Sequence, residues 1–107
     1  MSPRRSESLG RSERQQLSSR LVILISHLLK SEFQPAAREG GWQATIKEQR
    51  VRIQRLLARN PSPEPLFDET LEESYPLALI HAAKETNMVE EDFPRTCPYS
   101  KQVILHG

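Results

Sequence analysis

The sequence predicts an all-α fold, a small bundle of three main helices with a short C-terminal helix. Apolar residues recur at the three- and four-residue spacing of a helical face, and residues typical of helix caps, together with prolines, divide the chain into segments. The 107 residues allow one hydrophobic core but not two. We therefore expect a flexible arm over residues 1–9, which has no apolar periodicity, and a single domain over residues 10–107.

The first helix is expected over about residues 12–34. Ser12 and Gln15 have the spacing of a capping box, which satisfies backbone N–H groups at a helix N-terminus. Apolar side chains then occupy several faces of its middle: Leu17, Leu21, Val22, Ile23, Leu24, Ile25, Leu28 and Leu29. Because a helix that is apolar almost all round is normally buried on two sides, we expect this one at the centre of the fold.

The second helix is expected over about residues 42–60, where a narrower apolar stripe ends before Pro61. The third is expected over about residues 63–86, with Ser62 as its N-cap. Pro76 lies inside this third segment and lacks a backbone N–H, at a cost of about 3 kcal/mol in a helix interior. We therefore expect the third helix to be kinked or broken near Pro76.

Two further caps divide the C-terminal part of the chain. Asn87 followed by Met88 is typical of a left-handed helix cap with its hydrophobic contact. Ser100 suits the N-cap of a final helix over about residues 100–105.

The single cysteine, Cys97, excludes an internal disulfide and favours a cytoplasmic location; we interpret it as a buried structural thiol. The apolar run at residues 21–25 and 28–29 is shorter than the roughly 20 residues that cross a bilayer, so no membrane partner is expected. No Glu-x-x-His or His-Glu-x-x-His motif occurs, and His81 with Glu85 forms only a single one-turn pair. The sequence thus predicts no metal site, no cofactor and no catalytic residue.

The net charge of +1 conceals two blocks of opposite sign. Residues 38–59 contain six basic and two acidic side chains, whereas residues 64–92 contain nine acidic side chains and one lysine. A hairpin would bring these blocks side by side, so Arg50 and Arg52 are expected to pair with acidic residues such as Glu72. Nucleic-acid binding through Arg52, Arg55 and Arg59 is a third hypothesis, which the acidic neighbour disfavours.

An ordered series of short motifs carries a family resemblance. They are Gly10-Arg11-Ser12-Glu13, His27-Leu28-Leu29-Lys30 with Gln34-Pro35, Trp42 with Thr45-Ile46, Glu48-Gln49-Arg50, Asn60-Pro61-Ser62, Tyr75 with Ala78 and Ala82, Glu85-Thr86, Phe93-Pro94 and Cys97-Pro98-Tyr99. Over about residues 9–105 the chain resembles the bacterial domain-of-unknown-function family 29. The resemblance implies a helical protein of the bacterial cytoplasm and no known activity, cofactor or substrate.

Three departures from the family pattern affect the expected packing of the first helix and the expected stability of the third. The chain corresponds to the C-terminal three-quarters of the family's length, with residues 1–8 in place of the usual leading helices. Pro76 is unusual for the family, and Asn87 stands where glycine is usual. Both of these residues are expected to weaken the third helix.

Four polar residues form a candidate site if the chain is an enzyme or a ligand-binding protein. Gln49 falls within the apolar stripe of the second helix, where a buried amide needs hydrogen-bond partners. His27 and Tyr75 are candidate partners, and Arg50 lies beside Gln49. This polar cluster is the alternative to our first hypothesis.

The first hypothesis is a non-enzymatic interaction module that docks a helical partner or forms a homodimer. In the absence of the family's leading helices, the first helix is expected to expose Val22, Ile23 and Leu29. The sequence therefore predicts a partner surface on this helix.

Overall fold

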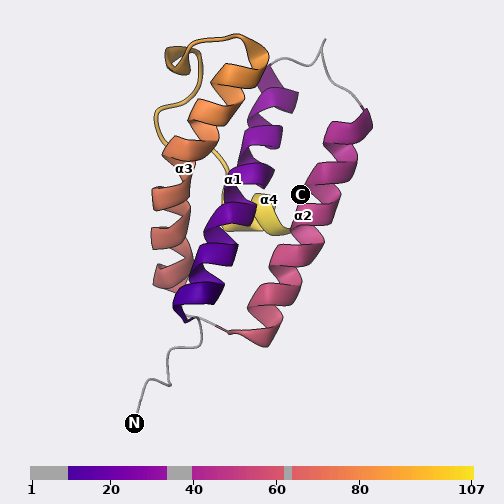
Figure 1. Cartoon of the computed structure of the whole chain (residues 1–107), viewed down its shortest axis with the longest axis vertical. Coiled ribbons are helices and arrows are strands. Elements are labelled where there is room, and N and C mark those ends of the chain that lie inside the picture. The colour runs from indigo at the N-terminus through magenta and orange to yellow at the C-terminus, as the bar shows by residue number, and fades with distance from the viewer. Residues whose placement is uncertain (1–9, 34–39, 62–63) are drawn as a thin grey trace.

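The computed structural model describes residues 10–33, 40–61 and 64–107. Within these ranges the chain forms α1 (Arg11–Phe33), α2 (Gly40–Arg59), α3 (Glu64–Thr86), a short 3-10 helix η2 (Glu90–Asp92) and α4 (Lys101–His106), and no strand. Helix α1 lies between α2 and α3 (Figure 1). The predicted all-α bundle with a short final helix is confirmed.

Hydrogen bonds between side chains define the directions of the three long helices. Ser18 lies opposite Ser74, with 2.8 Å between the two hydroxyl oxygens, and Lys30 pairs with Glu85, so α3 runs parallel to α1. Helix α2 runs antiparallel to α1, as expected for neighbours joined by a short connection. The N-terminal half of α1 therefore lies beside the N-terminal half of α3 and the C-terminal half of α2.

The N-terminus of α1 differs from the predicted capping box. The helix begins at Arg11, and the carbonyl of Gly10 accepts the first hydrogen bond, from the backbone N–H of Arg14 at 2.9 Å. Ser12 consequently lies inside the first turn, so its assignment as the cap was wrong. The predicted arm at residues 1–9, the Gln34-Pro35 end of the first helix and the Ser62 cap all lie outside the described residues.

Helix α3 continues through Pro76 from Glu64 to Thr86, so of the two predicted outcomes, a kink or a break, the break does not occur. Pro76 is exposed, and its ring lies away from the packed side of the helix. The backbone carbonyl of Glu72 nevertheless loses its usual intrahelical donor, because proline has no N–H. Packing of the buried face maintains the helix across this defect.

Replacing Pro76 by alanine is expected to raise the free energy of unfolding by about 1–3 kcal/mol, because the new N–H can bond to the Glu72 carbonyl. Part of the gain is offset because alanine leaves the unfolded chain more flexible. Urea denaturation followed by circular dichroism measures the change. Pro65→Ala is the matched control: Pro65 lies in the first turn, where proline is tolerated, and should give no gain. A P76A variant no more stable than the wild type would contradict the prediction.

Helix α3 ends in the predicted left-handed cap. Asn87 has φ of 60°, and its N–H approaches the Lys84 carbonyl at 3.4 Å. The N–H of Met88 bonds to the Ala83 carbonyl at 3.0 Å, and the Met88 side chain packs against the core. This is the Schellman arrangement, formed here by asparagine rather than glycine. The 3-10 turn η2 that follows was not predicted.

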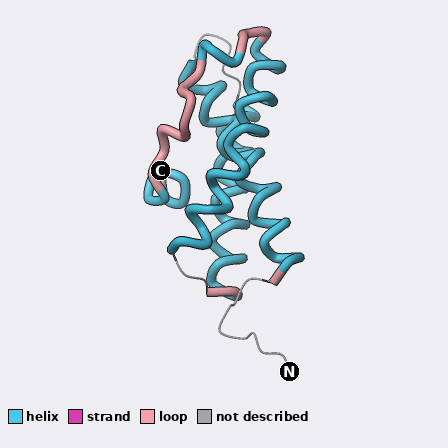
Figure 2. Tube along the Cα trace, turned by 90° about the vertical axis from the view of Figure 1, so that its left-hand side faces the viewer, coloured by secondary structure: helices cyan, strands magenta, loops and turns pink. Residues whose placement is uncertain are grey.

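After η2 the chain runs back along one side of the bundle to α4 (Figure 2). Ser100 caps α4 as predicted, since its hydroxyl accepts a hydrogen bond from the Val103 N–H at 3.2 Å. Ile104 and Leu105 are buried and close the core against α2. A six-residue helix is too short to be stable alone, so its position depends on these tertiary contacts.

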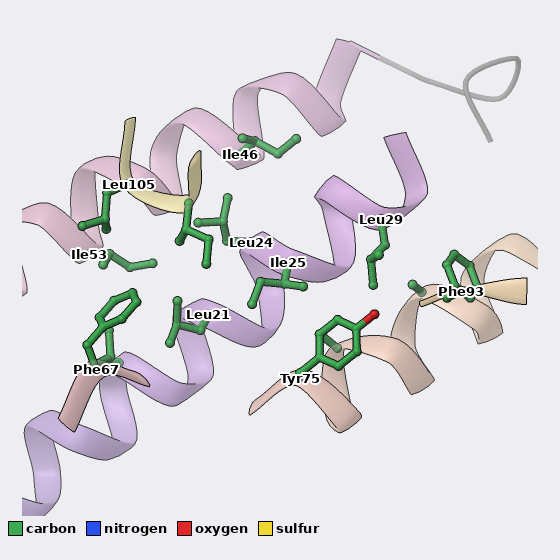
Figure 3. Packing of buried hydrophobic residues seen from close by; sticks show 14 of the residues in the cluster. Leu21, Leu24, Ile25, Leu29, Ile46, Ile53, Phe67, Tyr75, Phe93 and Leu105 are labelled. Atoms are coloured by element: carbon green, nitrogen blue, oxygen red, sulfur yellow. The ribbon is translucent and has the colours of Figure 1, made fainter. Parts of the chain in front are cut away.

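The core is built around the buried side chains of α1 (Figure 3). Leu21, Leu24 and Ile25 are fully buried, and they are surrounded by residues from every other α-helix. These surrounding residues include Ile46, Ile53, Leu56, Phe67, Tyr75, Ala78, Ile104 and Leu105. The expectation that α1 occupies the centre of the fold is therefore confirmed.

Candidate functional site

The four polar residues of the predicted cluster do not form one network, because each is bound elsewhere. His27 is half-buried, and its Nδ1–H donates to the Ile23 carbonyl at 2.8 Å within the same helix. Burial lowers the pKa of this imidazole, with the Lys30 charge adding to the effect. Tyr75 instead donates its hydroxyl to the Pro94 carbonyl at 2.6 Å and ties the C-terminal segment to α3. Burial raises the pKa of Tyr75 to about 12.

Gln49 is buried as expected, and its Oε1 accepts from Nη1 of Arg20 at 3.3 Å. Arg50 donates from Nε to the Ile104 carbonyl at 3.0 Å and from Nη2 to the Val103 carbonyl at 3.1 Å. These carbonyls belong to the last turn of α4, where that of Val103 also accepts a hydrogen bond from the Gly107 N–H at 2.9 Å. Arg50 thus acts as a side-chain cap for α4. No hydrogen bond described in the structure joins any two of the four predicted residues.

The predicted partner surface on α1 is also reduced. Leu29 is fully buried in the core, so its expected exposure was wrong. Val22 is half-buried and packs against the core, and Ile23 is 37% exposed. Helices α2 and α3 cover two flanks of α1, which leaves Ile23 as the exposed member of the predicted surface.

The expected pairing of Arg50 and Arg52 with acidic residues of the third helix does not occur. Arg52 pairs with Glu48 of its own helix, with 2.9 Å between Nη2 and Oε2. The ion pairs that reach α3 come from α1 and from Lys101 of α4, which binds Glu64 at 2.9 Å. Because α1 separates α2 from α3, the basic and acidic blocks lie on opposite flanks of the bundle (Figure 1).

A buried ion pair between Lys30 and Glu85 was not predicted. The Lys30 side chain is only 3% exposed, whereas that of Glu85 is 51% exposed. The Lys30 ammonium also lies 5.0 Å from the centroid of the Trp42 ring, a cation–π distance, so one lysine links all three long helices. Its hydrogen bond holds the pKa of Glu85 below the usual value. No signal in the sequence indicated this burial, because a spacing of seven residues places Lys30 on the helical face of Ile23, which is 37% exposed.

The Glu85 carboxylate binds Lys30, and no hydrogen bond or ion pair described in the structure joins it to His81. Among the described residues, no group of three or more His, Cys, Asp or Glu side chains could hold a metal ion. In the same parts of the chain, no helix is both long enough and apolar enough to cross a membrane.

Cys97 is a half-buried free thiol whose Sγ lies 3.6 Å from the Tyr99 carbonyl. Burial raises the pKa of this thiol and so favours its protonated, poorly nucleophilic form. Cys97 lines a cavity of about 500 Å³ together with Asp68, Glu72, Tyr75 and Arg95 among others. No histidine is among the described residues that line the cavity, so Cys97 lacks the neighbouring imidazole that commonly activates a cysteine nucleophile.

Comparison with protein families gives one match, to the family described as Domain of unknown function DUF29, over residues 6–107. The chain belongs to the DUF29 family. The predicted family is therefore confirmed over nearly the whole chain. Comparison with curated proteins and with solved structures gave no match.

In this DUF29 chain the most exposed apolar side chains of the long helices lie on α3, not on α1. Leu77 is 51% exposed and Ile80 is 46% exposed. They fall outside the buried face that contains Phe67, Ala78 and Ala82. The sequence signal was the presence of two large aliphatic residues off the predicted apolar stripe.

Glu73 lies four residues before Leu77, and Lys84 lies four residues after Ile80. The four positions 73, 77, 80 and 84 are separated by four, three and four residues, a spacing that places them on one face of a helix. All four side chains are exposed. We call Glu73, Leu77, Ile80 and Lys84 the α3 stripe; it is acidic at its N-terminal end, apolar in the middle and basic at its C-terminal end.

Proposed function

We propose that this DUF29 chain is a non-enzymatic helical interaction module that self-associates through the α3 stripe. The observation that carries the proposal is the exposed pair Leu77 and Ile80 between two opposite charges on a regular helix. Neighbouring exposed aliphatic side chains mark association surfaces more often than isolated ones do. Arg50 and Tyr75 of the candidate site support a structural role instead, since each holds two parts of the fold together.

A second copy of the chain is the partner that the charge pattern fits. If two α3 helices pack antiparallel about a two-fold axis, Leu77 of one copy faces Ile80 of the other. The same symmetry sets Glu73 opposite Lys84 at both ends of the contact. The stripe is thus self-complementary in both hydrophobicity and charge, as an isologous interface requires.

One helix pair buries less area than a standard protein interface, so the dimer should be weak, with a dissociation constant on the order of 10–100 µM. The first helix contributes Ile23 at most, because Leu29 is buried. We place this activity in the bacterial cytoplasm, in keeping with the family and with the free thiol of Cys97.

Replacing Leu77 by aspartate is expected to abolish dimer formation without unfolding the chain, because Leu77 is half exposed. Sedimentation equilibrium over a concentration series measures the dissociation constant, and circular dichroism checks the fold. Val51→Asp is the matched control, since Val51 is an exposed aliphatic residue on α2 and should leave the dimer unchanged.

A charge exchange tests the antiparallel register. Glu73→Lys and Lys84→Glu should each weaken the dimer, because each places like charges opposite each other. The double variant should restore it. A wild-type chain that stays monomeric at high concentration would refute self-association. A dimer indifferent to the Leu77 substitution would refute the stripe as its interface.

A further inference from the structure

A second surface feature lies on the other flank of the bundle, between the N-terminal half of α1 and the C-terminal half of α2. It is a cavity of about 360 Å³ whose lining includes four arginines, Arg20, Arg52, Arg55 and Arg59. Gln16 contributes a polar side chain and the buried Leu56 an apolar surface. No acidic residue lines the cavity. We call it the arginine pocket.

Two of the four guanidinium groups are held in place. Arg20 bonds to the amide oxygen of Gln49, which is itself 7% exposed and therefore fixed in the interior. Arg52 donates from Nε at 3.0 Å to the Glu48 carboxylate one turn earlier on α2. A guanidinium held by a fixed acceptor loses less conformational freedom when it binds a ligand.

The other two arginines lack a counter-charge within the part of the chain that the structure describes. Arg55 and Arg59 have no carboxylate partner among the described residues, although the chain contains 14 acidic side chains. Arg52, Arg55 and Arg59 follow at intervals of three and four residues on one helix, where like charges repel each other. An anion in the pocket would convert this repulsion into attraction.

We propose that the arginine pocket binds a small phosphate-bearing ligand. The planar guanidinium donates two parallel hydrogen bonds, a geometry that matches the oxygen atoms of a phosphate group. The cavity volume lies within the range of small-ligand sites, and Leu56 offers an apolar contact to the rest of such a ligand. The shared chemistry is a phosphate group, whether free or esterified.

A small ligand fits this surface better than a nucleic acid does. The unpaired arginines converge on one hollow rather than forming a long basic track. The opposite flank of the bundle carries the carboxylates of α3, which would repel an extended polyanion. The hypothesis of nucleic-acid binding through Arg52, Arg55 and Arg59 therefore becomes an outcome of the test.

The test is a titration of the full chain with pyrophosphate, followed by amide chemical shifts and by calorimetry. We expect saturable shifts at residues 16–20 and 52–59. The double variant Arg55→Ala/Arg59→Ala should bind at least about tenfold more weakly, because each lost charge-assisted bond accounts for about one such factor. Both arginines are exposed, so the fold should persist, which circular dichroism checks.

Two controls separate a specific pocket from general attraction. Lys47→Ala removes an exposed charge from α2 outside the pocket and should leave binding unchanged. Arg55→Lys/Arg59→Lys keeps the charge but loses the paired donors, so it should still weaken binding. Absence of saturable shifts, or equal weakening by K47A, would overturn the proposal. Binding of a DNA duplex but not of pyrophosphate would assign the pocket to nucleic acid instead.

Discussion

The Leu24→Ala variant is expected to lose about 3–5 kcal/mol of unfolding free energy. Leu24 is fully buried and lies in the part of the core that α1 shares with α2 and α4 (Figure 3). Truncation removes apolar surface from the core and leaves a cavity that surrounding helices fill only in part. Since a domain of this size is stable by about 5–15 kcal/mol, the variant should be close to unfolding at 37 °C. Urea denaturation followed by circular dichroism measures the loss.

Ile23→Ala is the control for this experiment, because Ile23 precedes Leu24 on the same helix and is 37% exposed. Its loss should be below about 1 kcal/mol. Equal losses for the two variants would mean that the two faces of α1 are equally buried, contrary to the structure. The same comparison tests the expectation from the sequence that α1 leaves part of its apolar surface exposed to solvent.

The Glu85→Ala variant is expected to lose about 2–3 kcal/mol, because it leaves the Lys30 ammonium buried without its carboxylate. The loss should be smaller than for a fully buried pair, since the Glu85 side chain is half exposed and Trp42 still faces the ammonium. Lys30→Met removes the buried charge instead and should cost less than about 1 kcal/mol. A larger loss for K30M than for E85A would show that the pair itself, not the buried charge, determines stability.

The same pair makes stability depend on pH in a defined direction. Lys30 depresses the pKa of Glu85 in the folded chain, so the contribution of the pair is fully present above the unfolded value of about 4.3. The contribution is lost as the pH falls through the depressed folded pKa. Between pH 5 and pH 3 the wild type should therefore lose more stability than K30M. Equal acid sensitivity of the two proteins would contradict this assignment.

Local sequence patterns predicted most of the secondary structure, because the deciding interactions are short in range. Asn87 adopts the left-handed conformation, and Met88 provides the hydrophobic contact of the cap. Ser100 caps α4 for the same local reason. Ser12 has the chemistry of a cap, yet α1 begins one residue earlier, at Arg11, directly after Gly10. Pro76 does not divide α3, because packing compensates for its missing N–H.

The candidate site could not be assembled from sequence, because its residues act through contacts that are distant in the chain. Arg50 has the chemistry of a ligand-binding residue, but the carbonyls that it caps lie more than 50 residues away. Leu29 lies on the widened face of the first helix and was expected to be exposed, whereas the surrounding helices bury it. The arginine pocket likewise depends on Arg20 of α1 lying against α2.

By itself, the sequence determined that this DUF29 chain is all-helical, that its central helix is α1 and which residues cap α3 at its C-terminus and α4 at its N-terminus, since periodicity and caps are properties of neighbouring residues. Only the tertiary structure decided which polar side chains form hydrogen bonds within the fold and which remain available to bind a ligand or partner. It placed α1 between the basic and acidic helices, so that Arg52 of α2 pairs within its own helix and carboxylates of α3 pair with α1 and α4. Burial and long-range pairing depend on how whole helices pack, and the spacing of residues along one helix does not contain that information.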